Sequence, residues 1–415
     1  MNFLYNLLIS AFNVLLPVIG LLSPKLSLFV KGRKTVFEIL SKSIKKEDHV
    51  IWFHCASLGE YEQGVPIMEE VKKKYPNYTL LVTFFSPSGY EVKKNSTLVD
   101  VIVYLPIDTK ANVQRFIKLV NPQLVIFVKY EFWPNYLKEL KSHNIPIAIV
   151  SATFREDQAF FKWYGGFMRK ALQTVDHFFV QDTISQRLLN QVGFNNVTIS
   201  GDTRFDRVSH QIEMDNQVDF ISEFIEDRLC VVIGSSWSED EEVFVDFVNQ
   251  ASDDLCFIIA PHEIKDNGVQ ALKQKLIGKT VLFSEKEEKN MIEYQVFIMN
   301  TIGYLSRVYS YGNIAYVGGA MGTSGLHNIL EPATFGIPII IGKNFEKFRE
   351  AKQLQKLAGL FSVSNATEFS SIMKKLIDNK KFRQQTGMIA GHFINSNTGA
   401  TDMIIEYLVE KLDSN

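Results

Sequence analysis

The feature that most constrains the fold is a regular alternation of apolar strand-like runs with helical patterns, which occurs twice along the chain. Hydrophobic residues stand at successive positions of these runs, so both faces of each predicted strand are buried. This pattern is typical of a parallel sheet covered by helices on both sides. The first round of predicted strands comprises Val50–Cys55, Thr79–Phe85, Val101–Leu105, Leu124–Val128, Pro146–Val150, Phe178–Gln181 and Val197–Ser200.

A second round follows a polar, charged stretch between Asp206 and Glu226, where no strand pattern occurs. The predicted fold class is therefore α/β, with two doubly wound, Rossmann-like domains, and the polar stretch is the predicted linker. Two such halves imply a cleft between them, with ligands at the carboxyl ends of the strands. The second round comprises Cys230–Ile233, Cys256–Ala260, Val281–Phe283, Val296–Met299, Ile314–Val317, Pro338–Ile341 and Leu360–Val363.

The apolar stretch Phe3–Leu22 precedes the first domain and is about long enough to span a bilayer. Asn6, Ser10, Asn13 and Pro17 interrupt it at helical spacing, so a helix lying in the membrane interface is also compatible with it. Four basic residues follow between positions 25 and 34, and basic residues beside a membrane segment favour the cytoplasmic face. We therefore expect membrane attachment there, with a first helix buried on the protein as the alternative.

These patterns predict three segments: an apolar, membrane-associated helix over 1–30, a first domain over 31–210 and a second over 211–415, which a C-terminal helix closes. The net charge of −2 creates no global basic field, so we expect no nucleic-acid partner. The three cysteines have neither the spacing of a disulfide framework nor that of a zinc site. We see no cluster of metal ligands in the sequence and predict no metal site.

The most distinctive stretch runs from Asn313 to Gly342, where a predicted strand ends in a glycine-rich loop that leads into a helix start. An α/β sheet presents backbone N–H groups to an anion in this way, and glycine permits close approach and positive φ angles. Asn328 and Glu331 also fit a helix capping box, and their spacing alone does not decide between the two roles. The ligand-binding candidates in this stretch are Gly318, Gly319, Gly325, His327, Asn328 and Glu331.

Three further strands of the second half also end in small or polar loops. Each loop is weak evidence by itself, but four loops at one sheet edge favour a nucleotide-sized site. No P-loop lysine is present, and no GxGxxG motif follows the first strand of either half. The candidates in these three loops are Ser235 and Ser236, Pro261 and His262, and Ile302 and Gly303.

Three turns of the first half carry the catalytic candidates Glu60 and Glu131. Glu60 falls in the first turn of a helix after the first strand, where a carboxylate can act as general base on an acceptor hydroxyl. The alternatives are a capping box for Ser57-x-x-Glu60, a helix cap for the turn at Ser86, and a surface ion pair between Lys129 and Glu131. The acceptor-side candidates are Ser57, Gly59, Ser86, Ser88 and Lys129.

Together these motifs resemble the 3-deoxy-D-manno-octulosonic acid (Kdo) transferases, which are inverting GT-B glycosyltransferases of lipopolysaccharide assembly. The likeness covers nearly the whole chain and rests on Ser-x-Gly-Glu ending at Glu60, Glu-x-Trp-Pro-Asn from Glu131, and Gly-Gly…His-Asn-x-x-Glu-Pro from Gly318. It implies a GT-B fold, the donor CMP-Kdo on the second half, and a lipid A precursor (lipid IVA) on the first half. It also implies attachment to the cytoplasmic side of the inner membrane.

The resemblance further implies that Glu60 is the catalytic base, that Asn328 and Glu331 bind the nucleotide, and that no metal or other cofactor takes part. Three stretches depart from the family pattern. One is Asn300-Thr301-Ile302-Gly303-Tyr304-Leu305, which stands where the family has Asp-Thr-x-Gly-Glu-Leu and weakens side-chain but not backbone contacts. The family usually has an acidic residue where Lys129 stands, and many members have Pro-Arg-His where this chain has Pro261-His262-Glu263. Histidine lacks the permanent charge of arginine, which weakens the case for a donor contact by His262.

Two alternative functions stay open at the level of sequence. One is another nucleotide-sugar glycosyltransferase or a sugar-nucleotide epimerase of the same architecture. The other is a non-catalytic, membrane-bound protein that binds a nucleotide sugar. A base at Glu60 beside a membrane helix disfavours the epimerase, which would not need this combination. Replacing Glu60 by Ala or Gln distinguishes the transferase from the binding protein.

Overall fold

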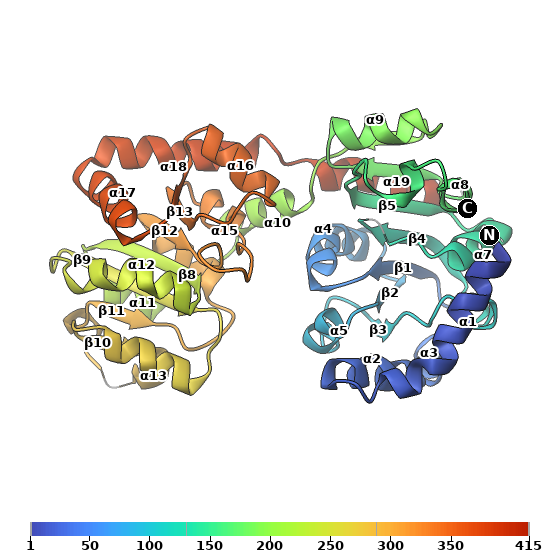
Figure 1. The fold of residues 1–415 in the computed structure, drawn as a ribbon, viewed down its shortest axis with the longest axis horizontal. Helices are drawn as coiled ribbons and strands as arrows, with labels where there is room; N and C mark the ends of the chain where they lie inside the picture. Colours follow the sequence, from blue (N-terminus) through green and yellow to red (C-terminus); the bar gives the residue numbers. More distant parts are fainter. Residues whose placement is uncertain (1, 130, 288, 414–415) are drawn as a thin grey trace. The chain divides into compact units, whose positions relative to one another are not determined.

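The computed structural model describes residues 2–129, 131–287 and 289–413 (Figure 1). The chain divides into two compact units: Met1–Arg207 together with Thr398–Asn415, and Val208–Asn397. Over the described residues, each unit contains one parallel sheet of seven strands. The predicted α/β class with two doubly wound, Rossmann-like domains is therefore confirmed.

The sheet of the first unit has the strand order β3-β2-β1-β4-β5-β6-β7. The order reverses between β1 and β4, which is the topological switch point where ligands bind in such sheets. Every residue of β1 is buried, as the unbroken apolar runs predicted. The strands are β1 (Val50–Cys55), β2 (Thr79–Phe84), β3 (Val101–Tyr104), β4 (Pro122–Val128), β5 (Ile147–Ala152), β6 (His177–Val180) and β7 (Val197–Ile199).

Helices cover both faces of this sheet. Trp52 belongs to the core on one face and Phe53 to the core on the other, because successive residues of a strand point to opposite sides. The α-helices of the unit are α1 (Asn2–Ile19), α2 (Pro24–Lys34), α3 (Val36–Ser43), α4 (Leu58–Lys74), α5 (Pro87–Lys93), α6 (Lys110–Val120), α7 (Pro134–Ser142), α8 (Gly166–Leu172), α9 (Thr183–Gln191) and α19 (Ala400–Asp413). The boundary between the two units falls within α10 (Arg204–His210).

The sheet of the second unit has the order β10-β11-β9-β8-β12-β13-β14, which reverses between β8 and β12. Its strands are β8 (Leu229–Ser236), β9 (Leu255–Pro261), β10 (Thr280–Leu282), β11 (Val296–Ile298), β12 (Ile314–Val317), β13 (Ile339–Gly342) and β14 (Leu360–Val363). Its α-helices are α11 (Asp219–Ile225), α12 (Ser238–Asn249), α13 (Asp266–Lys275), α14 (Leu305–Val308), α15 (Leu330–Thr334), α16 (Arg349–Lys356), α17 (Ala366–Asp378) and α18 (Lys380–Asn395).

The domain boundaries differ from the prediction at the C-terminus. The predicted second domain, 211–415, does not keep its last helix, because α19 packs its apolar face into the core of the first unit beside α4. Asp206 holds the start of this helix by accepting hydrogen bonds from the backbone N–H groups of Gly399 and Thr401, at 2.6 and 2.7 Å. The predicted linker also contains the ordered helix α11.

The N-terminal apolar stretch forms α1, which is long and apolar enough to cross a membrane. One side of α1 packs on the first unit: Tyr5 donates a hydrogen bond to Asp108 at 2.6 Å, and Leu16 joins a small core with Phe29 and Ile107. The other sides are exposed. One basic residue after α1 does not face outward, because Arg33 donates hydrogen bonds to three backbone oxygens, those of Phe29, Phe85 and Leu105.

Candidate functional site

In the first unit, the turns after β1, β2 and β4 meet at the carboxyl edge of the sheet. The N–H of Ser86 donates to the carbonyl of Ala56 at 2.8 Å, which joins the first two turns. Trp133 Nε1 donates to His54 Nε2 at 3.2 Å, which joins the turn after β4 to β1. Burial lowers the pKa of His54 to about 3, so this imidazole is neutral and accepts from Trp133. The structure therefore brings these three turns together at one edge.

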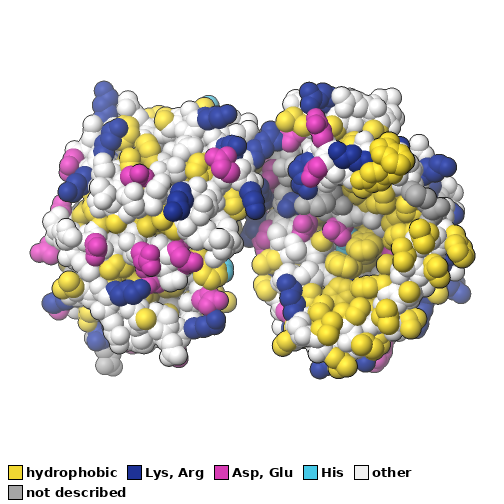
Figure 2. All heavy atoms as spheres, viewed as in Figure 1, with side chains coloured by type: hydrophobic (Ala, Val, Ile, Leu, Met, Phe, Trp, Pro, Cys, Tyr) yellow, Lys and Arg dark blue, Asp and Glu magenta, His cyan; other side chains and the backbone are white. Residues whose placement is uncertain are grey.

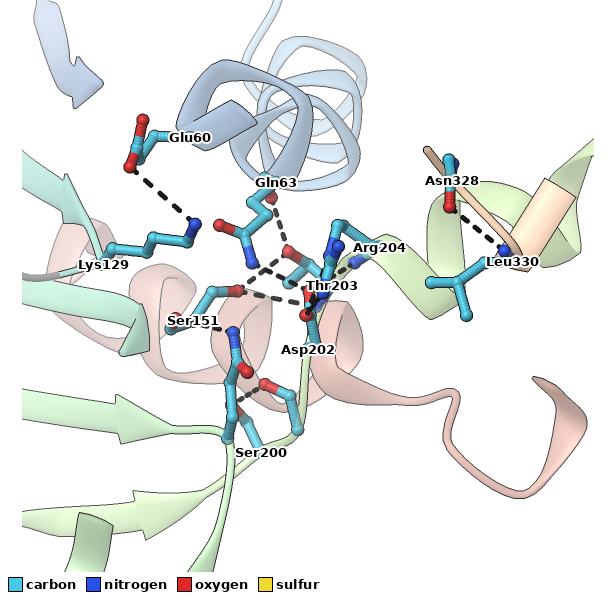
Figure 3. A network of polar contacts seen from close by, with 12 residues as sticks. Glu60, Gln63, Lys129, Ser151, Ser200, Asp202, Thr203, Arg204, Asn328 and Leu330 are labelled. Carbon is cyan, nitrogen blue, oxygen red and sulfur yellow. Dashed lines mark hydrogen bonds and ion pairs between the residues drawn. The ribbon is translucent and has the colours of Figure 1, made fainter. Parts of the chain in front are cut away.

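Glu60 lies two residues into α4, directly after β1. The predicted alternative, a capping box with Ser57, does not form: Ser57 occupies the N-cap position, but its side chain makes no capping hydrogen bond. Its hydroxyl donates instead to the Glu60 carboxylate. Lys129 Nζ lies 3.8 Å from Glu60 Oε1, and the Glu60 side chain is 12% exposed (Figure 3). Glu60 is thus a largely enclosed carboxylate with a hydroxyl and an ammonium beside it.

Lys129 ends β4 in a left-handed backbone conformation, with φ of 67°. A non-glycine residue pays a steric penalty there, and such strain is found mainly at functional sites. The turn directs the lysine side chain to Glu60. Lys129 thus pairs with Glu60, whereas the alternative from the sequence was a surface ion pair between Lys129 and Glu131. Tyr130, inside the same motif, lies outside the described residues.

Glu131 is the second carboxylate of this edge. Burial, followed by the nearby charge of Glu60, raises its pKa to about 7. Two carboxylates that share a site rarely both ionise, because each disfavours the charge of the other. The structure therefore places Glu60 and Glu131 close enough to interact, with one of them held partly protonated near neutral pH.

The two serines after β2 form the N-terminal cap of α5. Ser86 is the N-cap of α5, and its hydroxyl accepts a hydrogen bond from the N–H of Ser88 at 3.3 Å. The helix-cap alternative is therefore confirmed for this turn. A side chain at Gly89 would meet the ring of Phe84 at 2.4 Å and the N–H nitrogen of Leu58 at 3.0 Å, so glycine lets the β2 turn approach the start of α4.

A buried polar network behind α4 was missed at the level of sequence. Gln63, one turn after Glu60, donates to Asp202 at 2.9 Å, and Thr203 donates to the backbone oxygen of Gln63 at 2.6 Å (Figure 3). Burial opposes the charge of Asp202, but Arg204 and the hydrogen bond from Gln63 outweigh it and lower the pKa. The network joins the helix that carries Glu60 to the turn after β7.

In the second unit, the turns after β8, β9 and β12 likewise meet at the carboxyl edge. The rings of Trp237 and His262 stack with centroids 4.5 Å apart, and those of His262 and His327 lie 4.3 Å apart. Trp237 Nε1 donates to His327 Nε2 at 3.2 Å. Burial, followed by His262, lowers the pKa of His327 to about 4. The cluster offers ring faces and neutral polar groups rather than fixed positive charge.

The serines of the β8 turn are placed by a bulge. Ser235 has a φ of 54°, and the pairing of β8 with β9 shifts register between Gly234 and Ser236. The Ser236 hydroxyl is buried, and it has no hydrogen-bond partner among the described residues. A buried polar group without a partner is costly, so this hydroxyl is suited to receive a ligand.

Asp240 organises the glycine loop and was not predicted. It lies in the first turn of α12, is fully buried, and accepts hydrogen bonds from the N–H groups of Trp237 and Gly319, both at 2.9 Å. Tyr316 on β12 donates to its other oxygen at 2.7 Å. The signal for Asp240 was the acidic opening of the helix after Ser235-Ser236, which sequence reasoning treated as a helix start only.

The predicted need for glycine in this loop is met at Gly318 and Gly319. A side chain at Gly318 would lie 2.4 Å from the backbone oxygen of Ser235. Gly319 has a φ of 92°, and a side chain there would lie 2.2 Å from the backbone oxygen of Gly325. The loop therefore packs backbone against backbone, at a distance that only glycine permits.

The remaining candidates lie nearby or farther along the same edge. Asn328 caps the N–H of Leu330 at 3.1 Å and donates to Glu331 at 3.1 Å, so its capping alternative is realised in a variant form (Figure 3). Pro261 ends β9 next to His262. Ile302 and Gly303 are exposed beyond β11, the neighbour of β9. Over the described residues, no group of three or more potential metal ligands occurs.

Comparison with known proteins agrees with this geometry. A family profile described as 3-deoxy-D-manno-octulosonic-acid transferase (kdotransferase) matches residues 31–207. The 3-deoxy-D-manno-octulosonic acid transferase of Haemophilus influenzae is 27% identical over 100% of this chain and 99% of its own length. Both matches support the resemblance of this chain to the Kdo transferases. The Kdo transferase of Aquifex aeolicus is 28% identical over 83% of this chain and 92% of its own length.

Solved structures show the same architecture. The UDP-GlcNAc 2-epimerase of Neisseria meningitidis superposes with a TM-score of 0.62 at 14% identity, over 87% of this chain and 100% of that one. MurG of Acinetobacter baumannii gives 0.53 at 11% identity, over 88% and 99%. These likenesses establish the GT-B fold alone. The predicted GT-B fold is therefore confirmed. The family profile and the curated relatives separately support a glycosyltransferase of the Kdo transferase type in lipopolysaccharide biosynthesis.

Proposed function

We propose that this protein moves Kdo from CMP-Kdo to a lipid A precursor, lipid IVA, with inversion at the anomeric carbon. A hydroxyl oxygen of the acceptor attacks the anomeric carbon of Kdo, the bond from that carbon to the phosphate oxygen of CMP breaks, and CMP leaves. The proton of the hydroxyl passes to Glu60. The observation that carries this assignment is the Glu60 carboxylate at the β1 switch point, freed from capping and partnered by Ser57 and Lys129.

Glu60 suits the role of base better than Glu131 does. The pKa of Glu131 is raised to about 7 by burial and by Glu60, so it holds a proton for much of the time near neutral pH. Lys129 forms an ion pair with Glu60, which Glu131 does not share within the described residues. Environments that separate two neighbouring carboxylates in this way assign them different roles. We assign proton removal to Glu60, and acceptor binding and support of the base to Glu131 and Lys129.

The second unit supplies the proposed donor site. The unpartnered Ser236 hydroxyl and the close-packed Gly318–Gly319 loop lie on the adjacent strands β8 and β12. We propose that they contact the phosphate of CMP, with the Trp237 and His262 rings available to stack on the sugar or base. Leaving-group charge is then stabilised by hydrogen-bond donors of the protein, and the proposal includes no metal ion or other cofactor.

We further propose that the protein works at the cytoplasmic side of the inner membrane, where α1 contacts lipid. The support is the length and apolarity of α1 and the exposure of its outer face. A lipid A precursor is an amphipathic molecule, so its transferase gains access by resting on the membrane that holds the acceptor.

Product analysis tests the proposal. The full-length protein is incubated with CMP-Kdo and lipid IVA, and mass spectrometry follows the gain of Kdo on the acceptor. We expect turnover by the unaltered protein and a loss of about 10²- to 10⁴-fold in Glu60→Gln, with CMP binding retained. Unchanged turnover in Glu60→Gln would refute the base assignment. CMP binding without any transfer by the unaltered protein would favour a nucleotide-sugar binding protein instead.

A further inference from the structure

A short turn between β5 and α8 holds two aromatic side chains outward. Trp163 is 92% exposed and Tyr164 is 52% exposed, and their rings contact each other with centroids 5.6 Å apart. A single exposed apolar side chain is common, but a contiguous exposed apolar patch marks an interaction site, so these two rings matter together with their surroundings. Neither residue takes part in the proposed chemistry.

Several hydrogen bonds hold this turn in a defined conformation. Arg169 of α8 donates hydrogen bonds to the backbone oxygens of Phe160 and Lys162, at 2.7 and 2.9 Å. Gly165 closes the turn by donating to the oxygen of Lys162 at 2.9 Å, and a side chain at Gly165 would lie 2.1 Å from the backbone oxygen of Ala159. The exposed aromatic pair is therefore a defined feature of the fold.

This turn adjoins α1. The rings of Tyr5 in α1 and Phe167 in α8 lie with centroids 5.4 Å apart. Away from this contact, α1 exposes a broad apolar surface, and Figure 2 shows hydrophobic side chains gathered over α1 with basic side chains at the margin. The most exposed of these residues are Phe3, Leu4, Leu7, Leu8, Val14, Leu15, Val18, Leu21 and Leu22.

The charge of both segments suits an anionic surface. Residues 2–37 and 158–175 contain no Asp or Glu. Arg33 and Arg169 are turned inward by their backbone hydrogen bonds, which leaves the lysines of these segments as the outward charges. These lysines are Lys25, Lys31, Lys34, Lys162 and Lys170. Lysines beside an apolar face are attracted to anionic lipid headgroups, and Trp and Tyr rings favour the headgroup level.

We propose that α1 and the Trp163–Tyr164 turn form one face that binds an anionic lipid bilayer, with α1 lying in the interface rather than spanning it. The inference rests on the proposed membrane location and adds a second contact and an orientation. Spanning is disfavoured because one side of α1 is bound along its length to the folded unit, through Tyr5–Asp108, Asn6–Asn135 and the Leu16 core. A helix that crossed the bilayer would carry these polar groups into hydrocarbon.

Vesicle flotation without donor or acceptor tests the second contact. The full-length protein is mixed with vesicles of phosphatidylcholine alone or with added phosphatidylglycerol. We expect stronger binding to the anionic vesicles and a drop of about ten-fold for the double variant Trp163→Ser, Tyr164→Ser. The matched control, Ile277→Ser with Met388→Ser, removes two similarly exposed apolar side chains, 84% and 66% exposed, from the second unit and should bind as the unaltered protein does.

Two outcomes would overturn the proposal. Equal vesicle binding by the aromatic double variant removes the second contact. Self-association of the unaltered protein that the double variant loses, without any change in vesicle binding, would identify a second copy of the chain as the occupant. Transfer of Kdo to detergent-dispersed acceptor should be unchanged in the double variant, so a failure of the membrane face is distinguishable from a failure of the proposed reaction.

The orientation of α1 has its own readout. A protease-cleavable tag placed before Asn2 stays on the outside of vesicles if α1 lies in the interface, and cleavage then goes to completion. Protection of the tag inside sealed vesicles would show a spanning helix and refute the interfacial orientation.

Discussion

At the scale of single residues, the edge of the first sheet depends on Lys129. It adopts a left-handed backbone that few side chains favour, and this turns its ammonium toward Glu60. Without the lysine, Glu60 and Glu131 face each other with no described counter-charge, which disfavours ionisation of the pair. Lys129, where the family usually has an acidic residue, thus places a positive charge beside the two carboxylates.

The variant Lys129→Asn tests this balance. Asparagine tolerates the left-handed conformation but carries no charge, so the backbone is kept while the ion pair is lost. We expect a decrease of roughly ten-fold in kcat with CMP binding unchanged, because the donor site lies in the other unit. The control is Lys141→Asn, which removes a surface partner of Asp176. Equal loss in both variants would show a general effect of charge.

Glu131 should make stability depend on pH. Its pKa is raised from 4.5 to about 7, so the native state holds a proton that the unfolded state releases between these values. Because the native state then binds more protons, the free energy of unfolding falls as pH rises from about 4.5 to 7 and levels off above. Glu131→Gln should remove this fall, which amounts to up to about 3 kcal/mol. Urea unfolding at pH 4.5, 6 and 8 measures it, and a parallel pH dependence in both proteins would contradict the assignment.

At the scale of elements, local periodicity was enough to predict the strands. The first predicted strand, Val50–Cys55, coincides with β1, because unbroken apolar runs identify strands buried on both faces. Strand ends were less predictable. β8 continues through Ser235 and Ser236 by way of a bulge, which depends on pairing with β9 and leaves no local signal.

The site candidates show the same limit. Proximity of the turns followed from sheet topology, but the partner of each side chain did not. Ser57 donates to Glu60 instead of capping α4, and Glu60 also pairs with Lys129, which follows another strand. Asp240 was missed because its partners Tyr316 and Gly319 are far away in the sequence. The roles proposed for these residues stay predictions.

Asp240 offers a test of how one element supports the donor site. Asp240→Ala leaves the N–H groups of Trp237 and Gly319 and the hydroxyl of Tyr316 without their acceptor. We expect a loss of roughly 3 kcal/mol in the free energy of unfolding and weaker CMP binding, since buried unpaired donors are costly. Urea titration and calorimetry measure the two effects. Glu242→Ala, an exposed change in the same helix, should alter neither.

At the scale of the whole molecule, the two units differ in how the chain builds them. The first unit consists of two separate segments and the second of one continuous segment. One core cluster of the second unit is formed by described residues between Val231 and Leu376, all from within that unit. The core of the first unit needs α19, which supplies Ile404, Ile405, Leu408 and Leu412. The chain therefore leaves the first unit after Arg207 and returns to it at Thr398. Sequence periodicity predicted α19 but not its destination, because both units offer an apolar sheet face.

This asymmetry predicts how fragments behave. Residues 208–397 expressed alone should unfold cooperatively and bind CMP, because their core and the proposed donor site are both complete. Residues 1–207 alone should be less stable than the same residues linked to 398–415, by roughly 5 kcal/mol, since several side chains of α19 lose their burial. Urea unfolding of the three fragments compares them directly. Equal stability of 1–207 without 398–415 would contradict the prediction. It would mean that α19 does not contribute to the stability of the first unit.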